Sequence, residues 1–244
     1  MGQRCKYMKR TLGNRIKALL GYIRILPRVF LRYAVKLINS VAYYVYFFQI
    51  TGRQFEGLNL GCGYSRIKNF CNIDANLRAH CDVVAGIDKI KLSSNSVGVI
   101  YNSHVFEHIP REKAIKVLEE WYRVIRTGGK IYICVPDLEV LFKAYLDNLP
   151  FYNTEKGRYI VDRACYLVYG GQANKYEFHF YGYSFVTLRN LLESVGFKNV
   201  HSFSRAQSDF SFSPPKDIST VSFQVTSTMK MDDLPWSLNI EAQK

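Results

Sequence analysis

The sequence predicts an α/β fold, a mostly parallel sheet with helices on both faces, preceded by a basic amphipathic helical arm. Short apolar runs alternate with helical segments from residue 55 onward, which is typical of such a sheet. Residues 1–55 contain eleven Lys or Arg and no Asp or Glu, which marks the arm. We therefore expect an arm over residues 1–52, one domain over 53–230 and a weakly ordered tail over 231–244.

The positive charge of the chain belongs to this arm. The 244 residues have a formal net charge of +13, but residues 56–244 hold 22 basic and 20 acidic side chains, a net charge of only +2. A nearly neutral domain argues against nucleic acid as its partner. The six cysteines form no Cys-x-x-Cys pair, so we expect free thiols, a reducing environment and a cytoplasmic location.

The arm has the pattern of a helix that lies on a membrane. Basic residues recur at every fourth position among apolar ones, at Arg24, Arg28, Arg32 and Lys36. The uncharged run over 37–52 has 16 residues, fewer than the roughly 20 that span a bilayer. We expect peripheral binding to the inner, anionic face of the membrane through residues 1–50. Two alternatives stay open: the helix packs on its own domain with the basic stripe in water, or it binds nucleic acid.

The strands are short apolar runs, and the helices are longer segments bounded by proline or glycine. We expect strands at residues 55–60, 71–74, 82–86, 97–101, 130–136, 197–203 and 218–227. We expect helices at residues 110–126, 138–148 and 184–195. The first of these helices should bury a face formed by Ile115, Leu118, Tyr122 and Ile125.

Residues 150–183 break the alternation of strands and helices. They contain seven tyrosines and show no clean period. We interpret them as an insertion on the substrate side, over the carboxyl edge of the sheet where ligands bind in such folds.

A glycine turn follows the first strand, in the sequence LNLGCG. Gly61 and Gly63 allow the backbone to turn sharply and a ligand to approach it closely. Asp74 ends the next strand only ten residues after Gly63, which leaves too little chain for a long helix. A pyrophosphate ligand needs a third glycine and the N-terminus of such a helix. The pattern therefore favours a nucleoside without phosphate, whose ribose hydroxyls donate to Asp74.

Four motifs in this order resemble class I S-adenosylmethionine-dependent methyltransferases: LNLGCG, NID, NSVGVIYNSHVFEHI and EEWYRVIRTGGKIYICVPD. The resemblance covers roughly residues 55–203. Within the family, the chain is most similar to small bacterial members associated with surface-glycan synthesis. The resemblance implies a Rossmann-like, seven-stranded, mostly parallel sheet with one antiparallel strand near the C-terminus. It also implies S-adenosyl-L-methionine as the cofactor.

The resemblance implies which residues contact this cofactor. The two glycines would line its methionine part, Asp74 its ribose, Asp88 its adenine, and Ser103 the transferable methyl group. Many relatives have an acid where Asn59 stands, and its amide can still accept a hydrogen bond. The expected cofactor contacts are Asn59, Gly61, Gly63, Asp74, Asp88 and Ser103.

A hydroxyl acceptor needs a base that removes its proton. His104, after the fourth strand, and His179, in the insertion, are the catalytic candidates, while Glu107 and Asp137 are candidates for contacts to the acceptor. His104 and His108 are four residues apart, as metal ligands on a helix can be. Two histidines with Glu107 on another face do not make a metal site, so we expect no metal.

These observations together predict a methyltransferase that O-methylates a sugar or another small-molecule or lipid-linked acceptor near the membrane. A nucleic-acid-directed methyltransferase is the second hypothesis, with the arm as an electrostatic clamp. A non-catalytic protein that retains the fold is the third, because Asn59, Ser65 and Gly86 depart from the family pattern.

Overall fold

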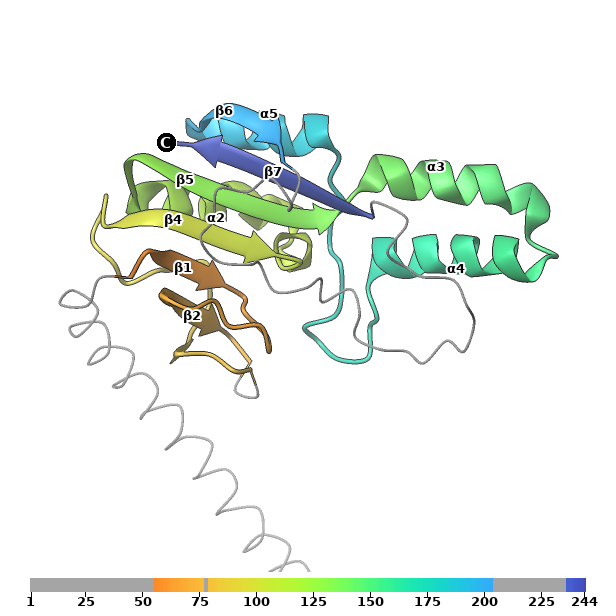
Figure 1. Ribbon diagram of the computed structural model, residues 1–244, viewed down its shortest axis with the longest axis horizontal. Coiled ribbons are helices and arrows are strands. Elements are labelled where there is room, and N and C mark those ends of the chain that lie inside the picture. The colour runs from red at the N-terminus through yellow and green to blue at the C-terminus, as the bar shows by residue number, and fades with distance from the viewer. Residues whose placement is uncertain (1–54, 77–78, 204–235) are drawn as a thin grey trace, which may run out of the picture. The chain divides into compact units, whose positions relative to one another are not determined.

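The computed structural model describes residues 55–76, 79–203 and 236–244. It contains a seven-stranded sheet in the order β3-β2-β1-β4-β5-β7-β6 (Figure 1). The strands are β1 (Gly57–Leu60), β2 (Phe70–Asp74), β3 (Val83–Val84), β4 (Val97–Ser103), β5 (Ile125–Pro136), β6 (Lys198–Ser202) and β7 (Ser237–Gln243). The helices are η1 (Phe106–His108), α2 (Arg111–Val124), α3 (Leu138–Asn148), η2 (Leu149–Phe151), α4 (Glu155–Tyr169) and α5 (Phe185–Val195). The predicted arm and the expected strand at 218–227 lie outside the described residues.

The first five strands are parallel, and the chain changes direction across the sheet between β1 and β4. β1 pairs with β2 on one side and with β4 on the other, so that Leu60 is aligned with both Ile73 and Asn102. No helix separates β1 from β2 in the described part of the chain, as the short spacing predicted. The segments that follow β1, β2 and β4 therefore leave the sheet at one edge, where ligands bind in open α/β sheets.

The fold class predicted from the sequence is confirmed, but the role of the C-terminus was predicted wrongly. Residues 237–243, expected within a weakly ordered tail, form β7, which pairs antiparallel with β5 and with β6. Leu238, Ile240 and Ala242 alternate with more exposed residues and are buried. Because β7 lies between two other strands, its apolar face completes the core, and the domain extends to the last residues.

The buried face of α2 also differs from the expectation. It is formed by Ala114, Val117, Leu118, Trp121 and Val124, whereas Ile115 is 42% exposed. Trp121 fixes this rotation, because its indole Nε1 donates to the carbonyl of Ile87 at 2.8 Å while its ring is fully buried. Ile125, which we placed on the helix, is already the first residue of β5.

Residues 150–183 contain a regular helix that the tyrosine-rich sequence concealed. α4 begins after Thr154, whose hydroxyl accepts from the amide of Gly157, and ends at Gly170 with φ of 78°. α3 and α4 lie side by side as a hairpin beyond the end of β5 (Figure 1). The buried residues of this helix are Gly157, Ile160, Val161 and Ala164, and the two small ones among them do not stand out as apolar positions in the sequence.

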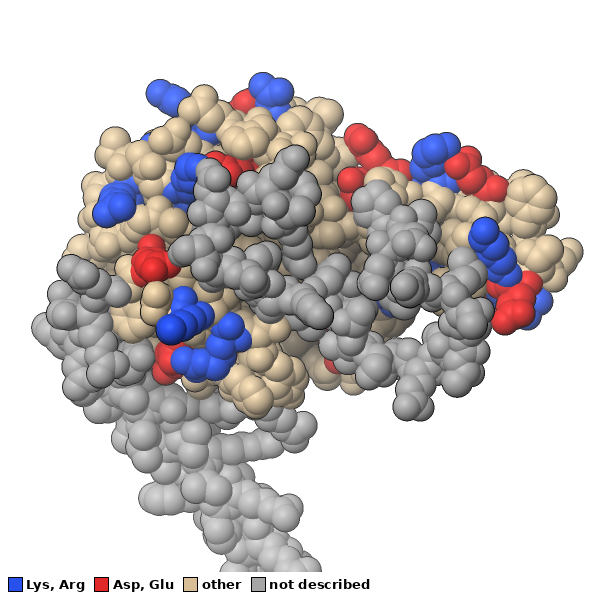
Figure 2. All heavy atoms as spheres, in the orientation of Figure 1, with Lys and Arg blue, Asp and Glu red and all other residues tan. Residues whose placement is uncertain are grey.

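The described surface mixes both signs of charge, as Figure 2 shows for one face. This agrees with the near-neutral composition of residues 56–244. Among the residues described, no helix has the length and apolar character that crossing a bilayer would require.

The position of β7 in the core leads to a test with a matched pair of isoleucines. We expect Ile240→Ala to lower the free energy of unfolding by about 2–5 kcal/mol, because the side chain is completely buried. Ile115→Ala removes the same atoms from an exposed position and should change it by about 0.5 kcal/mol or less. Denaturant titration measures both, and equal effects would contradict the placement of β7 in the core.

Candidate active site

The glycine turn after β1 forms a corner in which the two glycines have different reasons to lack a side chain. Both have left-handed backbones, with φ of 72° at Gly61 and 52° at Gly63. A Cβ on Gly61 would lie 2.3 Å from Cγ2 of Val105, so this glycine permits close packing of the segment after β4. A Cβ on Gly63 would meet no atom of the described residues within 4 Å. The backbone at Gly63 is therefore open to a ligand.

Asp74 points into this corner, as the sequence predicted. Its Oδ2 accepts a hydrogen bond from the amide of Gly63 at 2.8 Å, and its Oδ1 accepts one from the amide of Asn76 at 2.7 Å. Each carboxylate oxygen has two lone pairs, so each can accept a further hydrogen bond. A ribose offers two adjacent hydroxyl donors, which match this remaining capacity. The open glycine and the half-buried carboxylate thus fit the nucleoside part of S-adenosylmethionine.

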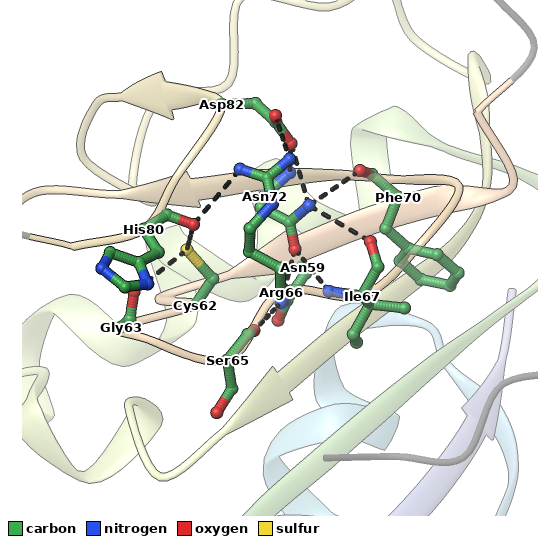
Figure 3. A network of polar contacts seen from close by, with 10 residues as sticks. All are labelled: Asn59, Cys62, Gly63, Ser65, Arg66, Ile67, Phe70, Asn72, His80 and Asp82. Carbon is green, nitrogen blue, oxygen red and sulfur yellow. Dashed lines mark hydrogen bonds and ion pairs between the residues drawn. The ribbon is translucent and has the colours of Figure 1, made fainter.

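A polar network behind the corner holds the loop in place (Figure 3). Asn72, on β2 and almost completely buried, is its centre. Its side-chain amide donates to the carbonyls of Ile67 and Phe70, and its Oδ1 accepts from the Ile67 amide at 2.8 Å and from Asn59 Nδ2 at 2.9 Å. The Asn72 side chain thereby provides hydrogen-bond partners for several buried backbone groups of the loop. These bonds fix the course of the backbone between the glycine corner and β2.

Asp82 extends the same network to the outer side of the loop. Its Oδ2 accepts from the backbone and side chain of Asn72 at 2.9 and 2.8 Å, and its Oδ1 pairs with the Arg66 guanidinium. Partial burial favours the neutral acid, but the hydrogen bonds from Arg66 and Asn72 outweigh it and lower the pKa of Asp82. Arg66 also donates to the carbonyl of His80, whose amide donates to Gly63 O. These contacts position the corner from behind.

Asn59 belongs to this supporting network. Its Nδ2 donates to the carbonyl of Ser65 and to Asn72 Oδ1, both at 2.9 Å, and the residue is buried. An acid at this position could not donate these two hydrogen bonds, which explains why Asn stands here. Contact of Asn59 with the cofactor stays a prediction. Asp88 is exposed after β3, with Oδ1 2.6 Å from where a Cβ on Gly86 would be. Its contact with adenine likewise stays a prediction.

Cys62, between the two glycines, is not a nucleophile in this state. Burial, followed by the nearby negative charge of Asp74, raises the pKa of its thiol to about 12. The thiol therefore stays protonated near neutral pH.

The segment after β4 brings a histidine to the corner. Ser103 is the last residue of β4, and His104 has a left-handed backbone with φ of 52°, which turns the chain out of the sheet. The His104 amide donates to Cys134 O at 2.8 Å, and its Nε2 lies 3.3 Å from the hydroxyl of Ser237 on β7. Strained non-glycine residues of this kind cluster at functional sites.

Of the next four residues, the first two anchor the segment and the last two contribute to the site. Val105 packs over Gly61. Phe106 is fully buried against Trp121 and Tyr183, with ring centroids 5.6 and 5.1 Å away. These anchors hold η1 rigidly, so Glu107 and His108 are presented from a fixed backbone.

Glu107 is the centre of a histidine cluster that the sequence did not bring together. Its Oε1 lies 3.4 Å from His104 Nδ1 and 4.0 Å from His179 Nε2. The rings of His108 and His179 meet edge to face, with centroids 4.7 Å apart. We define Glu107, His104, His108 and His179 as the histidine–glutamate cluster. The predicted catalytic pair, His104 and His179, thus lies beside the same carboxylate oxygen.

The charge state of the cluster follows from burial and mutual proximity. Complete burial favours the neutral acid of Glu107, but His104, followed by His108 and His179, outweighs it and lowers the pKa of this carboxyl. Burial lowers the pKa of His179, although the Glu107 carboxylate opposes this. A buried carboxylate therefore lies beside a neutral imidazole near neutral pH.

Asp137 has a structural contact that the sequence did not predict. It caps α3, where its Oδ1 accepts from the amides of Glu139 and Val140 at 3.0 and 3.3 Å. Ser237 was missed as well, because its strand had been expected to be a tail. No local pattern relates Ser237 to His104, which is 133 residues earlier.

Comparison with known proteins supports the interpretation of the corner. Residues 58–133, about a third of the chain, match the family described as a methyltransferase domain. None of the curated proteins compared with this chain matches it.

Solved structures of three methyltransferases are similar to this chain. One from Archaeoglobus fulgidus is 16% identical, covering 84% of this chain and 94% of its own, with a TM-score of 0.46. One from Mesorhizobium loti is 14% identical, covering 79% and 93%, with a TM-score of 0.44. One from Methanosarcina mazei is 14% identical, covering 79% and 93%, with a TM-score of 0.46. All three are described as dependent on S-adenosylmethionine.

The family match extends from β1 into β5 and so includes the glycine corner, Asp74 and the segment after β4. It spans the elements whose geometry fits a phosphate-free nucleoside. Residues 58–133 therefore match a methyltransferase domain, and the corner that they form fits S-adenosylmethionine as its cofactor.

Proposed function

We propose that the protein methylates a hydroxyl oxygen of a sugar or another small-molecule or lipid-linked acceptor, with His104 as the base. The observation that carries this proposal is the buried carboxylate of Glu107 beside His104, in the segment whose Val105 packs over Gly61 of the glycine corner. S-adenosylmethionine supplies the methyl group on an electrophilic sulfonium. The protein must align the acceptor and receive its proton.

The contacts of His104 favour one tautomer. Its Nδ1 faces the Glu107 carboxylate, which stabilises the tautomer with the proton on Nδ1. Nε2 then carries the lone pair, 3.3 Å from the hydroxyl oxygen of Ser237. As the carbon–sulfur bond breaks and the carbon–oxygen bond forms, Nε2 takes the hydroxyl proton. Glu107 stabilises the resulting imidazolium.

Exposed aromatic side chains beside the cluster support a sugar-like acceptor. The 178–181 segment is tied to the cluster, because the carbonyl of Phe178 contacts His108 Nδ1 and the amide of Phe180 donates to Glu107 O. The rings of Phe178, Phe180 and Tyr181 are 40%, 57% and 36% exposed. Aromatic faces of this kind provide stacking surfaces for the apolar side of a sugar ring.

Two features support an acceptor at the membrane. The arm combines basic and apolar side chains in one predicted helix. The α3–α4 hairpin exposes large apolar side chains around its tip, namely Phe142, Leu146, Leu149, Phe151 and Tyr152. Exposed apolar groups near one another are typical of interaction sites. A lipid-linked acceptor would be within reach of an enzyme held at that surface.

Asp74 provides the test of the cofactor site. We expect Asp74→Asn to weaken binding of S-adenosylhomocysteine about 10- to 100-fold, because hydrogen bonds to a charged acceptor contribute about 1.5–3 kcal/mol. The melting temperature should fall by less than about 4 °C, which corresponds to roughly 1 kcal/mol in a domain of this size. Calorimetry and thermal unfolding measure the two effects.

Asp82→Asn is the matched control, since it removes the same charge from the back of the loop, where Arg66 and Asn72 hold it. It should affect stability more than affinity. If both variants lost affinity equally, Asp74 would act only by shaping the loop.

His104 provides the test of the reaction. With labelled S-adenosylmethionine and a panel of nucleotide sugars and lipid-linked sugars, we expect a methyl ether as product. His104→Gln should slow turnover about 10²- to 10⁴-fold, as removal of a general base does, with cofactor affinity unchanged. His201→Gln, on the exposed edge strand β6, is the control and should leave the turnover rate unchanged. An unaltered rate in His104→Gln would exclude His104 as the base, and a nitrogen- or carbon-methylated product would contradict the proposed acceptor.

The arm is tested in the full chain by replacing Arg24, Arg28, Arg32 and Lys36 with Gln. We expect the unaltered protein to sediment with vesicles that contain phosphatidylserine and the variant to bind them far more weakly. Each basic residue near an anionic surface contributes about 1 kcal/mol. Binding to RNA without binding to vesicles would favour the nucleic-acid hypothesis instead.

A further inference from the structure

We propose that Glu107, His108 and His179 bind a divalent first-row transition-metal ion beside the glycine corner. Binding of the ion follows from the geometry of the three side chains alone. The use given to it below, holding the acceptor oxygen, rests on the proposed function. The sequence led us to expect no metal, because it showed two histidines on one short segment and could not show that His179 joins them.

The three donor atoms already converge. One carboxylate oxygen of Glu107 and one ring nitrogen from each histidine all lie within 4.8 Å of one another. In a tetrahedral site with bonds of about 2.1 Å, the donors are roughly 3.4 Å apart. The side chains therefore need to close by about an ångström around an ion, which small rotations of the two rings can provide.

Both rings are oriented as metal ligands usually are. His108 Nδ1 lies 2.9 Å from the carbonyl of Phe178, and His179 Nδ1 lies 2.8 Å from the carbonyl of Leu167. A carbonyl only accepts, so each ring has a proton on Nδ1, and Nε2 is the nitrogen left to bind an ion. A hydrogen bond from the far nitrogen to a backbone carbonyl is the outer contact that fixes metal-binding histidines.

Glu107 lacks the hydrogen bonds that a buried carboxylate requires, although His104 Nδ1 lies 3.4 Å from its Oε1. It is 1% exposed, and within the described residues neither Oε1 nor Oε2 has a hydrogen-bond partner. An ionised carboxylate in such surroundings costs several kcal/mol unless a cation compensates it. A divalent ion between Oε1 and the two imidazoles would supply this compensation.

The site is built from segments that the fold locks together. Glu107 O accepts from the amides of Phe180 and Tyr181, at 2.8 and 3.3 Å, which fastens the His179 segment to η1. Gly170 leaves room for the His179 ring, since a Cβ there would lie 2.8 Å from its Cδ2. The donors are therefore presented by fixed backbone, as a binding site requires.

The donor set selects the class of ion. Two imidazole nitrogens with one carboxylate suit Zn²⁺, Fe²⁺, Co²⁺ or Mn²⁺, whereas Mg²⁺ and Ca²⁺ prefer oxygen ligands throughout. Three protein ligands leave a coordination position open, which is the pattern of catalytic sites. An acceptor hydroxyl at that position would be held for methyl transfer and made more acidic. His104, whose Nδ1 lies 3.4 Å from Glu107 Oε1, would then receive the proton on Nε2.

Metal binding is measured on the full chain without acceptor or cofactor. After removal of metals with a chelator, we expect calorimetry to show one Zn²⁺ or Co²⁺ per chain. The visible spectrum of bound Co²⁺ should be that of nitrogen and oxygen ligands. His108→Asn and His179→Gln should each weaken binding by at least about 100-fold, since loss of a ligand's supporting partner alone costs about 10- to 100-fold. Unchanged melting temperatures and affinity for S-adenosylhomocysteine would show that both variants fold.

His201→Gln is the matched control, because His201 Nε2 also lies near a carboxylate, 3.9 Å from Glu241 Oε2, but on the exposed edge of the sheet. It should bind the ion like the unaltered protein. Absence of binding at millimolar ion, unchanged affinity in both cluster variants, or a thiolate charge-transfer band of Co²⁺ would each overturn the proposal. A chain that binds one ion at the cluster but methylates no oxygen acceptor would contradict the proposed function and leave the metal site standing.

Discussion

The arrangement of this protein depends on the direct parallel pairing of β1 with β4. Asn102, completely buried at the end of β4, donates from its side chain to the carbonyl of Leu60 at 2.9 Å and so ties the two strand ends together. The segments that follow these two strands therefore leave the sheet at the same edge. The glycine corner follows β1, and the segment with His104 and Glu107 follows β4. The packing of Val105 over Gly61 continues this contact beyond the sheet.

Two buried polar groups near this edge illustrate different roles. Asn72 is surrounded by partners and completes the hydrogen bonds of the loop behind the corner, so its contribution is to geometry. Glu107 is equally buried, yet its Oε1 lies 3.4 and 4.0 Å from two histidines, and neither carboxylate oxygen has a hydrogen bond among the described residues. Buried networks that are fully satisfied stabilise a fold, whereas an incompletely satisfied charge points to chemistry or to a ligand.

Much of the fold and half of the site could be predicted from local sequence. The glycine corner and Asp74 were predicted because a tight turn and a strand-end carboxylate are close in the chain and have few alternative roles. The caps of α5, Ser184 and Gly196, are local as well. The buried face of α2 was predicted wrongly, because a single hydrogen bond from Trp121 to a carbonyl 34 residues away decides the rotation.

The sequence by itself determined the alternation of strands and helices, the corner and the type of ligand that fits it, because these depend on contacts between near neighbours. Only the tertiary structure decided that β7 belongs to the core, that Asp137 caps a helix while His179 meets Glu107, and that Ser237 reaches His104. These contacts join residues far apart in the chain, and their free energy comes from burial and pairing that exist only once the sheet has formed.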